Sequence, residues 1–471
     1  MLPALLLAAV VPVTTAAALG DAVRNANPGD VIEVAPGTYS ISGKIRTGKA
    51  GTKESPITIR GTGATADTKL DFRDTDEGLV IGHSDWIIEH VWVNGACDGG
   101  GCGRGAGGIH VNAGGDRVII RYSKITNWEQ NIKSDRSDSA EPTDGQIIGN
   151  EISNTGDGYT NGGTGIDLVG GVRWYIAGNY VHDWARGATR YGIFVKGGAR
   201  DAIIERNLVV GARDLGPGPG PAIGISFGGG GTGTEFCAPE NRGNGGCTCE
   251  AFAGIARNNI VVHTTDAGLH TKRACGSIFA SNTVHDSGSN LGLQVQVEGT
   301  SPVVLTNSVL DSKISGRATD DNNALSLGIA GLEKIYADPD ALLFGKGADP
   351  SAAAGKAKPR ADVTNDYFGH ARSANDLGAI ELATAGTVWP WSENALEGVV
   401  APGPDGNGNP STPGTGADGG ASGSGGNGAT NGSGNGSDDD GGCSVGGRAS
   451  GAGVLPLLAL LLVRSRRRRT A

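Results

Sequence analysis

The sequence predicts an all-β protein, a single-stranded right-handed parallel β-helix with a short N-terminal capping helix. Short apolar segments recur with a period in the mid-twenties, which is the length of one turn of such a solenoid. Glycine is abundant, at 83 of 471 residues, and aromatic residues make up only 5%. This composition favours many short strands joined by tight turns over a helical globule.

Each repeat contains two recognisable short strands. The first begins with Gly followed by Ile or Leu, at residues 108–111, 165–168, 192–195, 268–271 and 292–295. The second carries an Asn, and the successive Asn positions differ by 29, 28, 52, 23 and 25 residues. The interval of 52 therefore holds either two coils or one coil with an insertion. The Asn residues are Asn150, Asn179, Asn207, Asn259, Asn282 and Asn307.

The repeat has a physical rationale. Alternate side chains of each strand point inward, so that Ile, Val and Leu stack on their counterparts one coil away. The recurrent Asn falls where the chain turns sharply, and its amide can bond the same backbone group in the adjacent coil. We therefore predict a structural Asn ladder, and we do not assign these residues to metal binding.

The ends of the predicted β-helix need caps, because an open end exposes unpaired strand edges. Residues 19–26 predict a short amphipathic capping helix, and Val31–Val34 predicts the first strand after it. This opening resembles the pectin lyase-like superfamily of extracellular β-helix carbohydrate enzymes, including the chondroitinase B and alginate lyase family. Residues 376–381 resemble the usual last strand of such domains, so the resemblance implies a strand there. The resemblance implies the fold over roughly residues 19–381, whereas function has to be argued from a site.

Targeting segments flank the predicted β-helix domain at residues 19–400. Residues 1–18 are almost wholly apolar and end in small residues, which indicates a secretory signal peptide. Residues 401–442, rich in Gly, Ser, Asn and Asp, predict a disordered linker. Residues 443–471 combine Cys443, a short apolar segment and an Arg-rich end, and they resemble the MYXO-CTERM sorting signal of myxobacteria. That resemblance implies processing and surface attachment at Cys443, after a transient membrane contact; a plain membrane anchor is the alternative.

An exported protein is expected to use its cysteines in disulfides. The first two of the six in the predicted domain close a Gly-rich loop and are predicted to pair. The next three share one irregular insertion, which the sixth, from a later coil, can reach. A structural zinc site at the Cys-x-Cys pair in the insertion is the alternative. The six are Cys97, Cys102, Cys237, Cys247, Cys249 and Cys275.

Aligned coils also align their outward-pointing residues into columns. The first column reads His110, Lys133, Asp167, Phe194, Ser226, His270 and Gln294. The second, two residues on, reads Asn112, Asp135, Val169, Lys196, Gly228, Lys272 and Gln296. Such a face predicts a shallow polar groove for an extended polymer, with His110, Asp167, Phe194 and Ser226 as substrate-binding residues. Ordinary solvated strand surface is the alternative.

An acidic insertion at residues 134–145 suggests a metal. Dense carboxylates can chelate Ca²⁺, which takes six to eight oxygen ligands. The candidate ligands are Asp135, Asp138, Asp144 and, slightly later, Asp157. The spacing matches no defined calcium loop, so a solvated acidic loop is the alternative.

The catalytic candidates are basic residues of the two columns. In a polysaccharide lyase a cation neutralises a uronate carboxylate, and a base then removes the acidified carbon-bound proton. Lys133 is the first choice for the base, because its segment resembles the Lys-Ser-bearing coil of the chondroitinase B family. This chain departs from that family, since only Glu129 stands upstream of Lys133 as an acid. Lys196 is the second choice, and Lys272 with His270 is the third.

The sequence therefore predicts an exported, monomeric, surface-displayed lyase that cleaves a uronic-acid polymer by β-elimination. The alternative is a non-catalytic surface protein that binds glycans or serves as a stalk. The net charge of −10 excludes a general nucleic-acid-binding role. The Gly-His-Gly and Arg-Ile-Lys segments of β-helix polygalacturonases do not occur.

Overall fold

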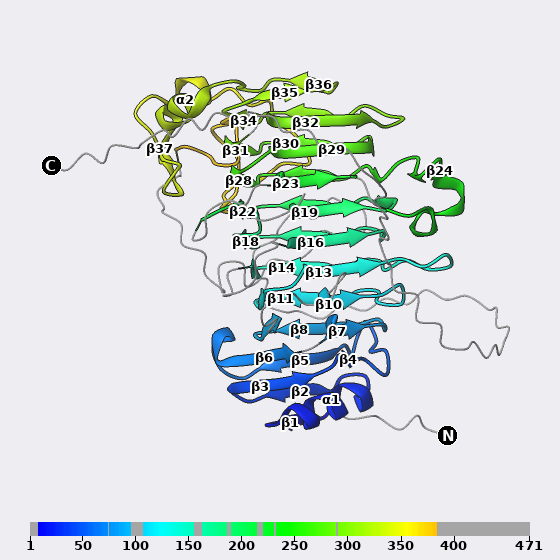
Figure 1. Cartoon of the computed structure of the whole chain (residues 1–471). Helices are drawn as coiled ribbons and strands as arrows, with labels where there is room; N and C mark the ends of the chain where they lie inside the picture. Colours follow the sequence, from blue (N-terminus) through cyan, green and yellow to red (C-terminus); the bar gives the residue numbers. More distant parts are fainter. Residues whose placement is uncertain are drawn as a thin grey trace, which may run out of the picture. The chain divides into compact units, whose positions relative to one another are not determined.

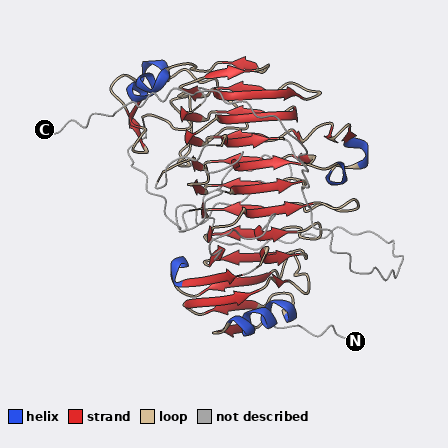
Figure 2. Ribbon diagram, in the orientation of Figure 1, coloured by secondary structure: helices blue, strands red, loops and turns tan. Residues whose placement is uncertain are grey.

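Three long parallel sheets wind into a right-handed β-helix, which confirms the predicted fold class (Figures 1 and 2). The computed structural model describes residues 8–73, 75–95, 107–154, 163–185, 190–213, 220–229, 232–288 and 291–383. Cys97, Cys102, Asp157, the predicted linker at 401–442 and the tail from Cys443 onward lie outside these ranges. No helix within them is long and apolar enough to cross a membrane.

Sheet A receives one strand from each coil, and all of its pairings are parallel. Its strands are β1 (Val10–Val13), β2 (Val31–Val34), β5 (Ile57–Gly61), β8 (Trp86–Glu89), β11 (Ile119–Arg121), β14 (Gln146–Ile148), β17 (Tyr175–Ala177), β21 (Ile203–Glu205), β27 (Ile255–Arg257), β30 (Ile278–Ala280), β33 (Val304–Thr306) and β36 (Thr319–Asp321).

Sheet B follows sheet A in each coil. Its strands are β3 (Gly37–Ser42), β6 (Thr68–Arg73), β9 (Trp92–Gly95), β12 (Lys124–Thr126), β15 (Glu151–Ser153), β18 (Tyr180–His182), β22 (Leu208–Val210), β28 (Ile260–Thr264), β31 (Thr283–Ser287) and β34 (Val309–Leu310).

Sheet C carries the two residue columns that the sequence analysis singles out. Its main strands are β4 (Ile45–Arg46), β7 (Glu77–Ile81), β10 (Gly107–Val111), β13 (Gln130–Asp135), β16 (Thr164–Val169), β19 (Arg190–Lys196), β23 (Ala222–Phe227), β29 (Ala267–Cys275), β32 (Leu291–Glu298) and β35 (Lys313–Ser315). Two short strands, β20 (Ala199–Arg200) and β26 (Ala251–Phe252), pair beside the end of β29.

The predicted capping helix is present as α1 (Ala16–Asn25), three residues earlier than expected at its start. Thr15 caps it by accepting a hydrogen bond from the Ala18 amide, and Leu19 and Val23 are buried against the first coil. Strand β1 precedes the helix and pairs with β2. The predicted signal-peptide boundary at residue 18 therefore falls inside α1, and the export signal stays a prediction.

The Asn ladder lies at the corner between sheets A and B. Each buried Asn donates to the next one, as Asn207 does to the Asn259 Oδ1 atom at 3.0 Å, and to a backbone carbonyl of the preceding coil. The residue before each ladder position has φ between 50° and 63°, which turns the chain. The ladder continues through Ser308, whose Oγ atom accepts from the Asn282 backbone N–H, to Asn323, whose Oδ1 atom accepts from the Ser308 backbone N–H at 2.7 Å. The prediction of Asn307 as a ladder residue was wrong, because Asn307 occupies the left-handed position itself, at φ 52°.

The interval of 52 residues is one coil with an insertion, because β22 pairs directly with β28. The insertion contains the short antiparallel strands β24 (Arg242–Gly243) and β25 (Gly246–Cys247). It lies beyond the end of sheet C (Figure 1).

The recurrent Gly of the repeat is required by the close approach of neighbouring coils. A Cβ atom on Gly165 would lie 2.5 Å from the Gly192 carbonyl oxygen, and one on Gly224 would lie 2.4 Å from the Gly268 carbonyl oxygen. These separations are far below van der Waals contact, so a larger residue would force the coils apart. A Gly followed by Ile or Leu thus lies near the start of most sheet C strands, whereas β13 has Asn131 in place of the glycine.

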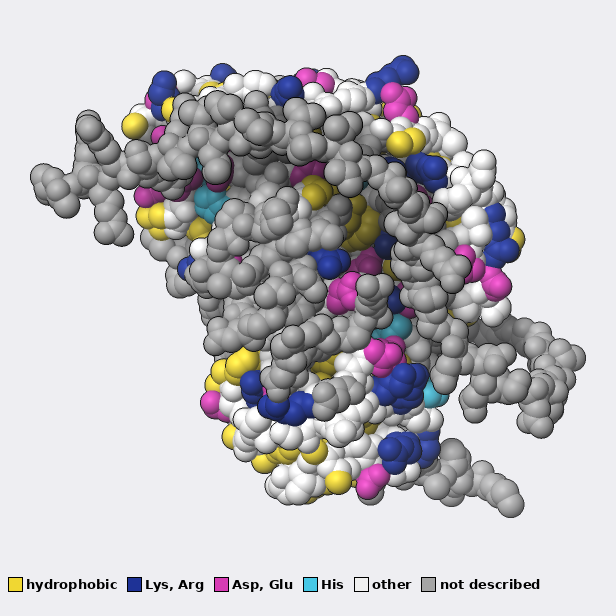
Figure 3. Space-filling model, viewed as in Figure 1, with side chains coloured by type: hydrophobic (Ala, Val, Ile, Leu, Met, Phe, Trp, Pro, Cys, Tyr) yellow, Lys and Arg dark blue, Asp and Glu magenta, His cyan; other side chains and the backbone are white. Residues whose placement is uncertain are grey.

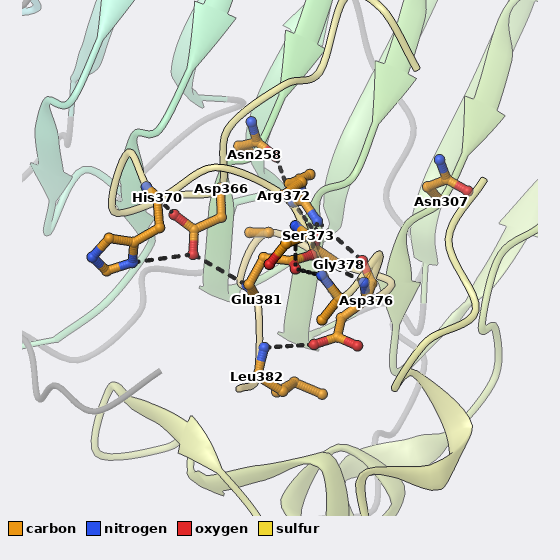
Figure 4. A network of polar contacts seen from close by, with 12 residues as sticks. Asn258, Asn307, Asp366, His370, Arg372, Ser373, Asp376, Gly378, Glu381 and Leu382 are labelled. Carbon is orange, nitrogen blue, oxygen red and sulfur yellow. Dashed lines mark hydrogen bonds and ion pairs between the residues drawn. The ribbon is translucent and has the colours of Figure 1, made fainter. Parts of the chain in front are cut away.

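The chain beyond β36 folds back over the outer face of sheet B. It contains α2 (Gly328–Ile335), β37 (Tyr336–Asp338) and β38 (Leu343–Lys346), and it buries an apolar cluster on this sheet. Arg372 binds this segment to the coils by donating to the Asn258 side chain at 2.7 Å, and it also donates to the Gly378 carbonyl within the segment at 2.7 Å (Figure 4). The predicted last strand at 376–381 was wrong: these residues form bends, in which Asp376 and Glu381 accept backbone N–H groups.

Replacing Asn207 by Ala is expected to lower the free energy of unfolding by about 2–3 kcal/mol or more. The substitution leaves the buried backbone N–H of Asn179 and the carbonyl of Ile176 without the partner that Asn207 provides, and it breaks the side-chain bonds to Asn179 and Asn259. Urea unfolding followed by circular dichroism measures the change. Asn25, which is exposed on α1, supplies the matched control, since Asn25→Ala should change stability by less than about 0.5 kcal/mol. Equal effects of the two substitutions would contradict a structural ladder.

A chain that begins at Leu19 is expected to melt at a lower temperature than one that begins at Ala8. The shorter chain lacks β1, the buried Val13 and the Thr15 cap, and it loses the hydrogen bond from the Tyr39 hydroxyl to the Val13 carbonyl. Differential scanning calorimetry compares the two. Identical melting curves would show that β1 contributes nothing to the fold.

Candidate functional site

The first predicted column is confirmed strand by strand on the outer face of sheet C. His110 lies opposite Lys133, and Lys133 lies opposite Asp167. The column continues through Phe194, Ser226, His270 and Gln294. In the second column, Asp135 lies opposite Val169 and Val169 opposite Lys196. The in-register stacking of coils therefore lines up side chains that are up to 184 residues apart in sequence.

Part of this face is a groove of about 470 Å³. Figure 3 shows basic, acidic and histidine side chains beside one another over this side of the molecule. The groove is lined by cations, carboxylates, two aromatic rings and amides, so it combines polar and stacking surfaces. Its charged and aromatic lining consists of Arg190, Lys196, Lys272, Asp167, Asp266, Tyr191, Phe194 and His270.

Charged groups pair with one another at the N-terminal end of the columns. His110 bonds to Glu77 through Nδ1 at 2.5 Å and to Asp135 through Nε2 at 2.9 Å, and the Lys133 ammonium lies 3.0 Å from the same Asp135 oxygen. The bond to His110 and the nearby Lys44 hold the Glu77 pKa at about 2 against the effect of burial. Burial alone would lower the His110 pKa, but the two carboxylates outweigh it and raise this pKa. The predicted base Lys133 is therefore one member of a compensated ionic network.

Asp167 occupies the next coil and differs from these carboxylates. Its Oδ1 atom is buried with no hydrogen-bond partner, and the closest cation that contacts it is the Lys196 ammonium, at 3.8 Å. Burial raises the Asp167 pKa despite the opposing charges of Lys196 and Lys133. Asp167 is thus poised to hold a proton or to bond an incoming hydroxyl.

Two stacked aromatic rings lie beside Lys196. The Tyr191 and Phe194 ring centroids are 3.8 Å apart with an interplanar angle of 11°. The Lys196 ammonium lies over Phe194, 4.5 Å from its centroid. Burial, together with the charges of Asp167 and Asp266, raises the Tyr191 pKa to about 12, so that its phenol keeps its proton at neutral pH.

His270 is the most perturbed base of the groove. Its side chain is buried, and its Nδ1 atom lies 2.7 Å from Ser226 Oγ. The Ser226 hydroxyl donates to the Gly228 carbonyl at 2.6 Å, so its oxygen must accept from Nδ1–H. This fixes the tautomer and leaves the lone pair on Nε2. Burial and the charge of Lys272 lower the His270 pKa to about 4, and the imidazole is therefore neutral at physiological pH.

The described carboxylates of the acidic insertion do not form one site. Each pairs with its own arginine: Asp138 with Arg242, and Asp144 with Arg173 at 2.7 Å. Asp135 belongs to the network with His110 and Lys133. Within the described ranges, no group of three ligating side chains is placed to hold a metal. The three described candidate ligands, Asp135, Asp138 and Asp144, are therefore each paired with their own cations. The fourth, Asp157, lies outside the described ranges, so the Ca²⁺ site stays a prediction.

Four of the six cysteines form disulfides, Cys237–Cys247 and Cys249–Cys275. This pairing contradicts the alternative of a zinc site in the insertion. The second bridge ties the insertion to β29, the strand that carries His270. Beside it, the buried Glu250 accepts the Gly197 amide at 3.1 Å and fixes the turn after Lys196.

Sequence reasoning missed three charged or aromatic residues of the groove, Arg190, Tyr191 and Asp266. Arg190 and Tyr191 precede the Gly192-Ile193 pair that marks the strand, and Asp266 stands just before the equivalent Ala267-Gly268. All three enter the groove from the corner between sheets B and C. The sequence could have indicated these residues by their position just before the Gly-Ile pair. The two columns included only residues that follow this pair.

No protein-family model matches the chain, and no curated protein sequence matches it either. Among solved structures, pectate lyase Pel9A superposes with a TM-score of 0.55 at 16% identity, covering 77% of this chain and 90% of that one. An alginate lyase from Paenibacillus sp. str. FPU-7 gives 0.35 at 18% identity, covering 67% and 97%. The PL6 family polysaccharide lyase Pedsa3628 from Pseudopedobacter saltans gives 0.40 at 12%, covering 67% and 92%. The likeness to the pectate lyase establishes a shared fold.

The His270 imidazole is expected to titrate near pH 4 in the folded protein, and nitrogen-detected nuclear magnetic resonance of labelled histidines measures this. Lys272→Gln removes a positive charge beside the ring and should raise this pKa. Lys346→Gln, at an exposed position of β38, is the matched control and should leave this pKa unchanged. A titration of His270 between pH 6 and 7 would contradict the neutral, desolvated imidazole.

Proposed function

We propose that this protein is a polysaccharide lyase that cleaves a uronic-acid polymer by β-elimination in the sheet C groove. One observation carries the proposal: a neutral, tautomer-fixed His270 lines a groove that also presents Lys196 and Lys272. A base, cations for a carboxylate and aromatic rings for sugar stacking are the groups that this chemistry needs. The shared fold with a pectate lyase supports the same assignment.

The uronate carboxylate is bound by a lysine of the groove, which withdraws charge and acidifies the adjacent C5–H bond. His270 Nε2 takes the C5 proton, and the electron pair of that bond forms the C4–C5 double bond. The C4–O bond then breaks, and its oxygen leaves with the bonding pair. An anionic substrate raises the pKa of the imidazole on arrival, which strengthens it as a base.

Tyr191 is the candidate acid for the leaving oxygen. Its ring centroid lies 6.2 Å from that of His270, so a single sugar unit in the groove contacts both rings. The phenol holds its proton at neutral pH and can transfer it to the glycosidic oxygen, after which solvent reprotonates it. This assignment replaces Lys133, whose ammonium is held by Asp135.

We also propose export, with the mature protein displayed on the cell surface or released outside the cell. Two disulfides in the described ranges support an oxidising compartment. The predicted tail, with Cys443 as its processing site, would supply the surface attachment.

The full chain is expected to release unsaturated products from at least one of pectate, alginate, chondroitin and hyaluronan, seen as a rise in ultraviolet absorbance. His270→Ala should lower kcat by at least about a hundredfold, since it removes the base. His370→Ala, on the exposed loop over sheet B, is the matched control and should retain activity. Runs with added Ca²⁺ and with a chelator show whether lysines suffice to neutralise the carboxylate.

New reducing ends without absorbance would indicate hydrolysis and overturn the lyase assignment. Binding of a polymer without any product would favour the alternative of a non-catalytic glycan-binding surface protein. Full activity of His270→Ala would place the base elsewhere in the groove.

A further inference from the structure

The side chains that β19, β23 and β29 present to the groove repeat with a period of two coils. Strand β19 presents Phe194 and Lys196, and β29, two strands away, presents His270 and Lys272 at corresponding positions. The coil between them contributes only Ser226 of β23 and Gly228, the residue after this strand, at these two positions. A coil that presents an aromatic ring or imidazole together with a lysine is therefore followed by a coil that presents neither.

The gap between the two lysines is enforced by the backbone. Gly228, the glycine of the middle coil, has φ 74°, and a Cβ atom on it would lie 2.1 Å from the Lys272 carbonyl oxygen. No larger side chain fits there without moving a strand, so no cation can stand at this level of the column. The two-coil period is thus a property of the fold at this point as well as of the sequence.

The distance between the two lysine positions follows from the spacing of the strands. Neighbouring strands lie about 4.8 Å apart, so the two lysine positions are separated by roughly 9.6 Å along the stack. The groove crosses the strands, because its lining comes from six successive strands of sheet C, from β13 to β32. A polymer lying along it meets one cationic level in every two coils, and an extended sugar unit is about as long as one coil step.

We infer that the groove selects a polymer in which a uronate alternates with an uncharged sugar, rather than a polymer of uronates alone. This inference rests on the proposed lyase function and deepens it. Uronate carboxylates of an alternating chain would meet Lys196 and Lys272, and the uncharged sugar between them would lie over Ser226. Among the described residues, no carboxylate forms an ion pair with Lys272, so its charge is available to such a ligand.

The coil on the other side of β19 supports the same alternation. It carries Asp167, whose carboxyl group projects into the groove without a hydrogen-bond partner on Oδ1. A uronate at this level would face another carboxyl group, whereas the hydroxyl or amide of an uncharged sugar would satisfy the open oxygen. In a polymer of uronates alone, one carboxylate would face Asp167 and another would lie at Gly228, where no cation is present.

The test compares binding and cleavage of length-matched oligosaccharides of two kinds. Hyaluronan and unsulfated chondroitin alternate uronate with an uncharged sugar, and pectate and alginate are wholly uronate. Titration calorimetry with the His270→Ala variant measures binding without turnover, and kcat/KM is measured with the unaltered chain. Alternating oligosaccharides are expected to bind at least about tenfold more tightly than wholly uronate ones.

Lys196→Gln and Lys272→Gln are each expected to weaken binding of the alternating ligand by roughly tenfold, and Lys346→Gln, outside the groove, should not. Asp167→Asn should improve the binding of wholly uronate ligands and so reduce the difference in affinity between the two kinds of oligosaccharide. Equal or tighter binding of pectate or alginate would overturn the inference while leaving lyase activity intact. Selective binding of the alternating ligand without cleavage by the unaltered chain would instead sustain the inference and overturn the lyase assignment.

Discussion

The chain turns from sheet A to sheet B through one left-handed residue and one ladder residue in successive coils, and the hydrogen bonds at this corner set the register of everything else. Asn150, Asn179, Asn207, Asn259 and Asn282 are each fully buried, so each must be satisfied by its neighbours above and below. A slip of one residue would leave amides unpaired in several coils at once and would turn every side chain of the following strand to the opposite face. The columns on sheet C are the consequence.

Two electrostatic regimes share the sheet C face. Toward the N-terminus, Glu77, His110, Asp135 and Lys133 compensate one another within hydrogen-bonding distance, so little charge is left for a ligand. Toward the C-terminus the charges are spaced by whole coils, and burial keeps His270 neutral. The same in-register stacking thus produces a self-satisfied network where opposite charges lie on adjacent strands, and a receptive surface where they do not.

Periodicity alone predicted the fold, the groove face and the members of the first column, because each depends on which residues recur once per coil. In the second column a shift in register after Thr271 places Val297, and not the predicted Gln296, beside Lys272. What it could not predict depends on local geometry. Asn307 and Ser308 differ in role by one residue, and only the backbone angle distinguishes them. Lys133 looks as free as Lys272 in the sequence, yet Asp135 on the same strand binds it. The carboxylates of the acidic insertion looked like a cluster, but each pairs with an arginine from another part of the chain.

The turn from sheet A to sheet B has a constant length, whereas the turns at the other two corners of the coil vary in length. Successive ladder residues are separated by 29, 28, 52, 23 and 26 positions, although the turn from sheet A to sheet B is equally short in these coils. All length differences therefore fall at the corners that border sheet C, where the disulfide-bonded insertion also lies. A scaffold of this kind lets a lineage rebuild the rims of its groove by insertion and deletion while its interior remains untouched, so that new specificities can arise without a loss of foldability.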